Sequence, residues 1–152
     1  MLELKEVPFE AVVNLLKEAE PEFMRLRDEP EVGAEERVRR WHAARQAQAM
    51  LCLRDGRTVG FTVARYADPP DTVAIGPMYI RPEFRRQGAG VEQVRLFLEW
   101  AMKRGFTKVE TRTWGANRAS QHILEKLGFA ATARRAGDRA GGDTTILYEW
   151  RR

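Results

Sequence analysis

The sequence predicts one α/β domain whose elements follow the order β-α-α-β-β-β-α-β-α-β-β. Residues 57–66 alternate apolar and polar side chains, as a half-buried strand does, whereas residues 91–103 carry apolar side chains at helical spacing. A glycine-rich turn at residues 85–90 joins a strand to that helix. A chain of 152 residues is long enough for one domain and buries roughly 70% of its unfolded surface. We therefore expect a single domain over residues 1–152.

Composition excludes several classes of protein. Hydrophobic residues make up 43% of the chain and charged residues 32%, which is typical of a globular and not a disordered protein. One cysteine and two distant histidines provide neither a disulfide framework nor a metal-ligand set, so no metal is expected. Residues 1–6 lack an apolar signal core, and the uncharged run 72–80 is far shorter than the ~20 residues of a membrane span. These features predict a cytoplasmic protein without a membrane partner.

The net charge of +4 suits a polyanionic ligand, and both a coenzyme and a nucleic acid are polyanions. The basic residues, however, are interspersed with glutamates and form no block with stacking aromatic residues. A nucleic-acid-binding protein is therefore an alternative that the charge pattern does not favour, and no nucleic-acid partner is expected.

The first third of the chain predicts one strand and two helices. Residues 2–7 alternate as a strand does, and apolar residues at helical spacing predict a helix over residues 9–19 that Pro21 ends. Prolines and a glycine in residues 20–36 predict a loop or a broken helix. A second helix follows, with Glu35 and Glu36 in its first turn and its end near Gln48.

The next segments predict a hairpin and a central strand. Asp55-Gly56 separates the apolar runs 49–54 and 57–66, which is a strong hairpin signal. Residues 72–80 are uncharged and predict a strand buried on both faces. Gly76-Pro77 interrupts this strand, and we expect a distortion there because proline cannot donate to a ladder and glycine marks bulges.

Arg85-Arg86-Gln87-Gly88-Ala89-Gly90 lies between that strand and the helix that begins at Val91. Such a turn directs backbone N–H groups toward one point, and the helix dipole adds partial positive charge there. The two arginines strengthen the field. The turn therefore predicts a site for a phosphate or pyrophosphate.

In the last third of the chain, predicted strands and helices again follow one another. Gly105 is expected to end the preceding helix, residues 108–114 to form a strand, and Asn117 to lead a helix that Gly128 closes. Two further strands, about 130–135 and 144–150, are joined by the glycine-rich loop 136–143.

Two motifs carry a family resemblance. Arg85-x-x-Gly88-x-Gly90 resembles the pyrophosphate loop of the GNAT superfamily of acetyl-CoA-dependent N-acetyltransferases. The segment from Asn117 to Phe129, an Asn-led helix ending in Glu-Lys-Leu-Gly-Phe, resembles the second signature of that family. The resemblance is close over residues 72–129 and rests on element order elsewhere. It implies an α/β (α+β) fold with a mixed, mostly antiparallel sheet of about seven strands, flanked by about four helices, in which strand 72–80 splays from strand 108–114.

The resemblance also implies acetyl-CoA as the co-substrate. Backbone N–H groups of the loop would bind the pyrophosphate, and the end of strand 72–80 would bind the pantetheine arm and polarise the thioester carbonyl. Asn117 would bond the same arm, or serve only as a helix N-cap, or both. The expected cofactor-binding residues are Met78, Tyr79, Ile80, Arg85, Arg86, Gln87, Gly88, Ala89, Gly90, Val91, Asn117 and Ser120.

One position departs from the family pattern. Seven residues after the asparagine the family usually has a tyrosine that protonates the leaving thiolate, and this chain has Leu124. Three proton donors are left open: Ser120, four residues earlier on the same helix face, Tyr79, and water. His122 should face elsewhere, since two residues rotate a helix by roughly 200°.

The general base is open as well. Strand 72–80 holds no carboxylate, so Glu110 on the following strand is one candidate. The acidic segment offers Glu22, Asp28 and Glu29. A plain surface charge is the simpler interpretation of each. Structural roles are expected for Glu83, His42 and the single cysteine, Cys52.

Family geometry implies that residues 20–36 and 136–143 wall the acceptor pocket. Seven carboxylates lie in residues 20–36, which predicts an acidic wall that attracts a cationic small molecule or a peptide amine. The apolar lining would come from Trp41, Trp114, Phe23 and Met24.

The resemblance therefore implies acetyl transfer from acetyl-CoA to a primary amine by direct attack in a ternary complex, without an acyl-enzyme. Members of the family are often dimers, so a homodimer is one expectation, although no interface is identifiable in the residues. Loss of the tyrosine leaves one further alternative, a non-catalytic CoA-binding or regulatory module.

Overall fold

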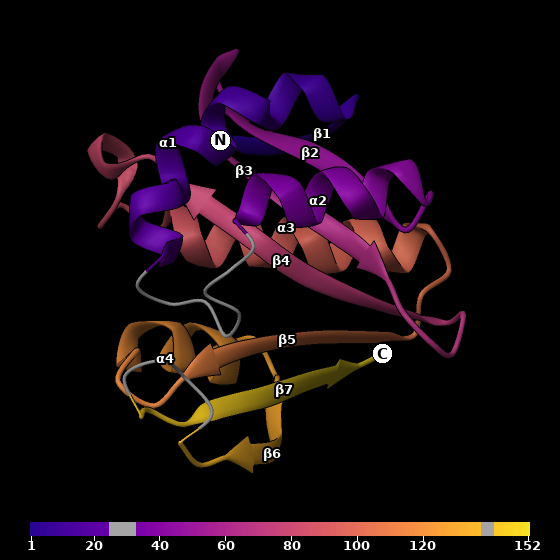
Figure 1. The fold of residues 1–152 in the computed structure, drawn as a ribbon, viewed down its shortest axis with the longest axis vertical. Coiled ribbons are helices and arrows are strands. Elements are labelled where there is room, and N and C mark those ends of the chain that lie inside the picture. The colour runs from indigo at the N-terminus through magenta and orange to yellow at the C-terminus, as the bar shows by residue number, and fades with distance from the viewer. Residues whose placement is uncertain (25–32, 138–141) are drawn as a thin grey trace.

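The computed structural model describes residues 1–24, 33–137 and 142–152, which form one sheet covered by helices (Figure 1). The strands lie in the order β1-β2-β3-β4-β5-β7-β6. The elements are β1 (Leu2–Val7), α1 (Val13–Met24), α2 (Ala34–Ala43), β2 (Ala47–Arg54), β3 (Arg57–Tyr66), β4 (Thr72–Ile80), α3 (Ala89–Lys103), β5 (Lys108–Trp114), α4 (Arg118–Lys126), β6 (Ala130–Arg135) and β7 (Thr145–Arg151). Short 3₁₀ helices cover Phe9–Val12 and Pro82–Phe84. The predicted order and sheet are confirmed.

The sheet is antiparallel except where β4 runs parallel to β5. That parallel ladder joins Thr72–Ala74 to Lys108–Glu110 and goes no further, so the two strands diverge toward their carboxyl ends (Figure 1). On its other side β4 follows β3 with a register shift between Thr62 and Ala64, opposite Gly76-Pro77. The distortion predicted at this dipeptide is therefore present, and the sheet opens there into a wedge.

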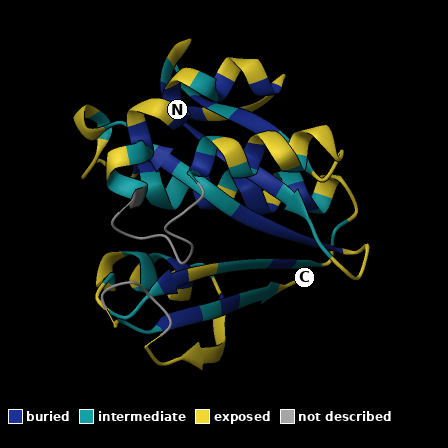
Figure 2. Ribbon diagram, viewed as in Figure 1, coloured by how far each residue is buried: buried dark blue, intermediate teal, exposed yellow. Residues whose placement is uncertain are grey.

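The helices are buried on the side that faces the sheet and exposed on the other (Figure 2), and apolar residues make up the buried side on each face of the sheet. On one face Val94 and Phe97 of α3 and Leu124 of α4 join the core around Val73 and Ile146. The opposite face carries a second core, built from α1, α2 and the strands β2–β4. Amphipathic helices thus make both cores, as the 3.6-residue periodicity predicts.

Helix α1 continues to Met24, past the predicted end at Ala19. A proline within a helix removes one hydrogen bond and costs about 3 kcal/mol. Pro21 is nevertheless helical, because the turn that follows it brings Phe23 edge-on to Phe61 and Tyr79, at ring-centroid distances of 6.4 and 6.2 Å. Tertiary packing overrides the local signal, and the predicted break at this proline is wrong.

Helix α2 ends at Ala43, five residues before the predicted end. Arg45 adopts a left-handed conformation with φ 58°, and the Gln46 N–H donates back to the Trp41 carbonyl at 2.7 Å. This turn lets β2 begin at Ala47. By contrast, the predicted hairpin is confirmed: Asp55 and Gly56 both have positive φ, at 51° and 79°, as a type I′ turn requires.

Substituting Gly60 by alanine should destabilise the fold severely. A Cβ at this position would clash with the Tyr79 carbonyl group and lie 3.1 Å from Cα of Ile80, and neither backbone can move without breaking the β3–β4 ladder. We expect a loss of about 3 kcal/mol in the free energy of unfolding. Urea unfolding measures it.

The matched control is Gly56→Ala, which adds the same methyl group at a residue of φ 79° with no neighbour within 4 Å. Only backbone strain of about 1 kcal/mol is expected there. Equal losses in the two variants would contradict the steric explanation.

Candidate active site

The glycine loop presents the first turn of α3 to solvent. Arg86 and Gly88 adopt left-handed conformations, with φ 62° and 77°, and these two reversals bring the chain from the 3₁₀ turn into the helix. Ala89 is buried and anchors the start of the helix. The N–H groups of Ala89, Gly90 and Val91 belong to the first turn, so they have no intrahelical acceptor. The first turn of α3 therefore has backbone donors that no helix carbonyl group occupies.

Arg85 is engaged within the protein. Its Nε donates to the Ile80 carbonyl at 2.8 Å, its Nη2 donates to Glu22 at 2.7 Å, and its guanidinium carbon lies 5.5 Å from the centre of the Tyr79 ring. Arg85 thus ties the end of β4 to α1, and Glu22 offsets much of its charge. The sequence predicts that Arg85 contacts phosphates or raises the local positive potential. Its contacts show a further, structural role, because they hold the end of β4 and the loop against α1.

The loop is also braced on its outer side. The Gln87 side-chain oxygen accepts a hydrogen bond from Arg54 at 3.0 Å. Arg86 is exposed, and it has no ion pair among the residues that the structure describes. Arg86 is thus the arginine of the loop whose charge no described carboxylate offsets.

A cavity of about 920 Å³ runs from the loop into the wedge between β4 and β5. Volumes of this size hold cofactor-sized ligands. The cavity brings together most of the predicted residues: Met78, Tyr79, Ile80, Arg85, Arg86, Gly90, Glu110, Asn117 and Ser120. The other predicted loop residues, Gln87, Gly88, Ala89 and Val91, lie in the turn beside it.

Helix α4 begins at the cavity. The Asn117 side-chain oxygen accepts from the Ser120 N–H at 3.1 Å, so its N-cap role is confirmed. Ser120 and Leu124 lie on the same helix face and both line the cavity. Leu124 is buried at the position where the family pattern has its tyrosine, whereas His122 is exposed, as expected.

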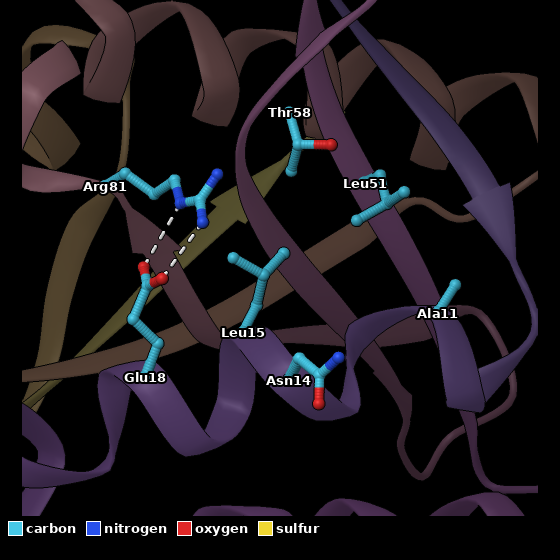
Figure 3. Close-up of a pocket in the computed structure, with 7 residues that line it drawn as sticks. All are labelled: Ala11, Asn14, Leu15, Glu18, Leu51, Thr58 and Arg81. Carbon is cyan, nitrogen blue, oxygen red and sulfur yellow. Dashed lines mark hydrogen bonds and ion pairs between the residues drawn. The ribbon is translucent and has the colours of Figure 1, made fainter.

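The hydroxyl group of Tyr79, one of the candidate proton donors, is engaged by another residue of the protein. This hydroxyl group interacts with the Glu18 carboxylate, and burial, together with the charge of Glu18, raises the pKa of Tyr79. Arg81 binds both oxygens of Glu18, at 3.0 and 3.2 Å, in a smaller hollow of about 210 Å³ (Figure 3). The hydrogen bond from Arg81 also lowers the pKa of Glu18. Tyr79 therefore stays protonated, but its hydroxyl group belongs to this Glu18–Arg81 cluster.

Glu110 lines the cavity at the last β4–β5 pair, where the strands part. Its carboxylate lies 3.3 Å from the Lys108 ammonium group, which is also 3.1 Å from Glu149. Glu22, another candidate base, is bound by Arg85. Asp28 and Glu29 lie outside the described residues.

Sequence reasoning missed Gln93. This residue is fully buried in α3, and its Nε2 donates to the Phe61 carbonyl at 3.0 Å. Its Oε1 has no hydrogen-bond partner among the described residues, and the side chain lines the cavity. The sequence does contain a clue: Gln93 lies three residues after Gly90 and four before Phe97, so a polar side chain shares a helix face with Phe97, which is buried.

Of the seven carboxylates of the predicted acidic wall, Glu22 lies in the described lining, and Asp28, Glu29 and Glu31 lie outside the described residues. Glu20 caps α2 by accepting from the Ala34 N–H at 3.1 Å, Glu35 lies 3.7 Å from Lys17, and Glu36 pairs with Arg40 at 2.6 Å. The part of the cavity beyond the wedge is instead lined by Trp41 and by arginines of α2, β3 and β5: Arg37, Arg40, Arg65 and Arg112. The predicted lining by Phe23 and Trp114 is confirmed, and the Met24 side chain is not described.

The described residues contain no group of three or more histidine, cysteine, aspartate or glutamate side chains placed to hold a metal ion. Within the same ranges of the chain there is no helix long and apolar enough to cross a membrane.

The comparisons with known proteins agree with this geometry. The model of the acetyltransferase (GNAT) family matches residues 9–129. A curated relative, the L-2,4-diaminobutyric acid acetyltransferase of Nocardia farcinica, is 36% identical over 85 residues, which are 55% of this chain and 41% of that protein. The chain thus spans about two fifths of the length of that relative.

Solved structures share the fold. The IAA acetyltransferase of Bacillus cereus superposes with a TM-score of 0.78 over all of both chains, at 17% identity. A Bacillus subtilis acetyltransferase in complex with CoA superposes with a TM-score of 0.77 over 100% of this chain and 99% of that one, at 16% identity.

The single cysteine should be unreactive in the folded protein. Cys52 is fully buried, and burial, followed by the charge of Glu92, raises the pKa of its thiol to about 11. At pH 8 only about one thiol in a thousand is then ionised. A colorimetric disulfide reagent should therefore modify it only after unfolding in urea. Rapid stoichiometric reaction of the folded protein would contradict this and reopen a covalent route.

Proposed function

We propose that this chain, which belongs to the acetyltransferase (GNAT) family, transfers an acetyl group from acetyl-CoA to a primary amine by direct attack in a ternary complex. The observation that carries the proposal is the continuous cavity. It extends from the donor-rich start of α3, through the wedge between β4 and β5, to a part lined by arginines and aromatic residues. Such a cavity accommodates two ligands that meet at the wedge.

The first ligand is acetyl-CoA. Its pyrophosphate accepts hydrogen bonds from the backbone N–H groups of Gln87, Gly88, Gly90 and Val91, and the helix dipole and Arg86 favour its charge. The β4–β5 ladder stops at Ala74, so the β5-facing edge of β4 from Gly76 onward can pair with the amide groups of the pantetheine arm, as an added strand does. Gln93 Oε1 and Asn117 are further polar groups along this path.

The second ligand is the amine. Its nitrogen attacks the thioester carbonyl carbon, and a backbone N–H among Met78, Tyr79 and Ile80 stabilises the oxyanion. The C–S bond then breaks, and the amine proton leaves to Glu110, directly or through water. The Ser120 hydroxyl group, on the cavity face of α4, gives its proton to the departing thiolate and takes a proton back from Glu110 through water, so that both residues return to their starting state. Cys52 takes no part, because it is buried outside the cavity.

The amine that accepts the acetyl group is proposed on separate grounds. The sequence favours a cationic small molecule or a peptide amine. The name of the Nocardia relative supports a small acceptor, since 2,4-diaminobutyrate carries two amino groups and a carboxylate. A single acetyltransferase domain over residues 1–152, a homodimer, a cytoplasmic location and the lack of nucleic-acid and membrane partners stay predictions from the sequence.

The alternative is a CoA-binding module without catalysis, and the observation that favours it is Leu124. With leucine in place of the tyrosine, the cavity lacks the usual proton donor of the family. Binding of acetyl-CoA without release of free CoA thiol, across a broad panel of amines, would support this alternative. Thiol release with any primary amine supports the enzyme.

Charge at the loop should control cofactor binding. Gly88 has φ 77°, and a Cβ added there would have no neighbouring atom within 4 Å. Asp and Asn tolerate this left-handed conformation better than other side chains, so both carry a similar, small backbone strain. Gly88→Asp places a negative charge beside the pyrophosphate, and repulsion of about 1–4 kcal/mol should weaken acetyl-CoA binding roughly tenfold to a thousandfold. Titration calorimetry measures it.

Gly88→Asn is the matched control, because it has the same shape without the charge. It should bind acetyl-CoA nearly as tightly as the parent. If the parent itself fails to bind acetyl-CoA or CoA, the loop is not a cofactor site and the proposed function is wrong.

Removal of the proposed proton donor should slow turnover without affecting binding. Ser120→Ala keeps the backbone N–H that Asn117 caps, so the helix should be intact. We expect kcat to fall about a hundredfold while KM for acetyl-CoA is unchanged. Adding Leu124→Tyr should restore much of the rate, because residue 124 lines the same cavity. An unchanged kcat in Ser120→Ala would assign the proton to water.

A further inference from the structure

We propose that the acceptor carries a carboxylate as well as its amine, and that Arg65 binds this carboxylate. The inference rests on the proposed function, because it concerns the second ligand of the same cavity. It narrows the expectation of a cationic small molecule or a peptide amine to an amine that also carries a carboxylate.

The described lining of the cavity has an excess of positive charge. It contains six arginines and two glutamates. Both glutamates already have cationic partners, Glu22 with Arg85 at 2.7 Å and Glu110 with Lys108 at 3.3 Å. Arg40 also pairs with Glu36, and Arg37 and Arg112 interact with other residues, so Arg65 and Arg86 are the arginines of the described lining that have no ion-pair partner among the described residues.

Arg65 is the residue on which the inference depends. It is half-buried in β3, and its guanidinium carbon lies 5.2 Å from the centre of the Trp41 ring. No carboxylate among the described residues lies within ion-pair distance of it. Burial of a guanidinium group is unfavourable, and this burial, with the nearby charge of Arg112, lowers the pKa of Arg65, against the smaller and opposite effect of the Glu110 charge. An anion from the ligand would relieve both effects.

The phosphates of CoA are too far away to be that anion. Arg65 pairs with Ala74 in the β3–β4 ladder, whereas the pyrophosphate loop follows Ile80 at the other end of β4. Six residues of strand span about 20 Å. The cavity therefore has two cationic ends, one at Arg86 and the start of α3, and the other at Arg65.

The distance between the wedge and Arg65 indicates the size of the acceptor. Gly76, where β4 leaves β5, lies two residues beyond Ala74, or about 7 Å along the strand. Glu110, the proposed base, pairs with Ala74 on its other side and so shares one row of the sheet with Arg65. An amine at the wedge and a carboxylate at Arg65 are thus separated by a few bonds, as in a small amino acid with a side-chain amine.

Three matched acceptors test the inference: 2,4-diaminobutyrate, its carboxamide and 1,3-diaminopropane. They share the reacting amine and differ in the carboxylate. Measured as thiol release, kcat/KM should be about tenfold or more higher for the acid than for either analogue. Equal or better turnover of the analogues would overturn the inference and leave the acetyltransferase function standing. Absence of turnover with every amine, despite binding of acetyl-CoA, would overturn both.

Substitution of Arg65 separates charge recognition from folding. Arg65→Met should raise KM for the acid about tenfold, while KM for acetyl-CoA and kcat/KM for 1,3-diaminopropane are unchanged. Arg65→Lys should keep part of the preference, and thermal unfolding reports whether either variant is folded. Arg135→Met removes an equal charge from exposed β6, outside the cavity, and should change nothing. An equal loss with acid and diamine in Arg65→Met would contradict the inference.

Discussion

The parallel ladder between β4 and β5 ends after three residue pairs, and the rest of the site depends on where it ends. Had it continued beyond Ala74 and Glu110, hydrogen bonds between the strands would occupy the backbone groups that a ligand needs. Gly76-Pro77 lies just beyond the last pair, opposite the register shift in β3. A proline has no backbone N–H group to donate to a ladder, so the position of Pro77 agrees with the position at which the pairing with β5 has ended. The helices on both faces keep the two halves of the sheet in place around the opening (Figure 1).

Electrostatics divide the cavity into two ends. Near the start of α3 the positive potential comes from backbone N–H groups and Arg86, because Arg85 is held by Glu22. At the far end it comes from guanidinium groups around Trp41, where Arg65 is half-buried. Arg65 and Glu110 both pair with Ala74, one from each side. The proposed base and the proposed carboxylate-binding residue therefore lie two strands apart in the same row of the sheet.

Proton transfer is where this chain departs from its family. Leu124 occupies the position of the usual tyrosine, and Tyr79, although protonated, is bound into the Glu18–Arg81 cluster (Figure 3). Ser120 is left as the hydroxyl group on the cavity face of α4. A thiolate is a good enough leaving group that modest assistance is sufficient, so the proposed mechanism depends more on the wedge than on any single acid.

Local patterns in the sequence determined the order of strands and helices, the Asp55-Gly56 hairpin, the distortion at Gly76-Pro77, the glycine turn before α3 and the N-cap at Asn117. Each depends on residues close together in the chain, where glycine, proline and periodicity act directly. Tertiary structure alone decided the rest. Helix α1 continues through Pro21 because Phe23 packs on Phe61 and Tyr79. Arg85 became a brace, the described acidic residues found partners within the protein, and arginines from α2, β3 and β5 line one cavity with Trp41. These outcomes depend on which distant side chains share a cavity, and charge along a chain does not reveal that.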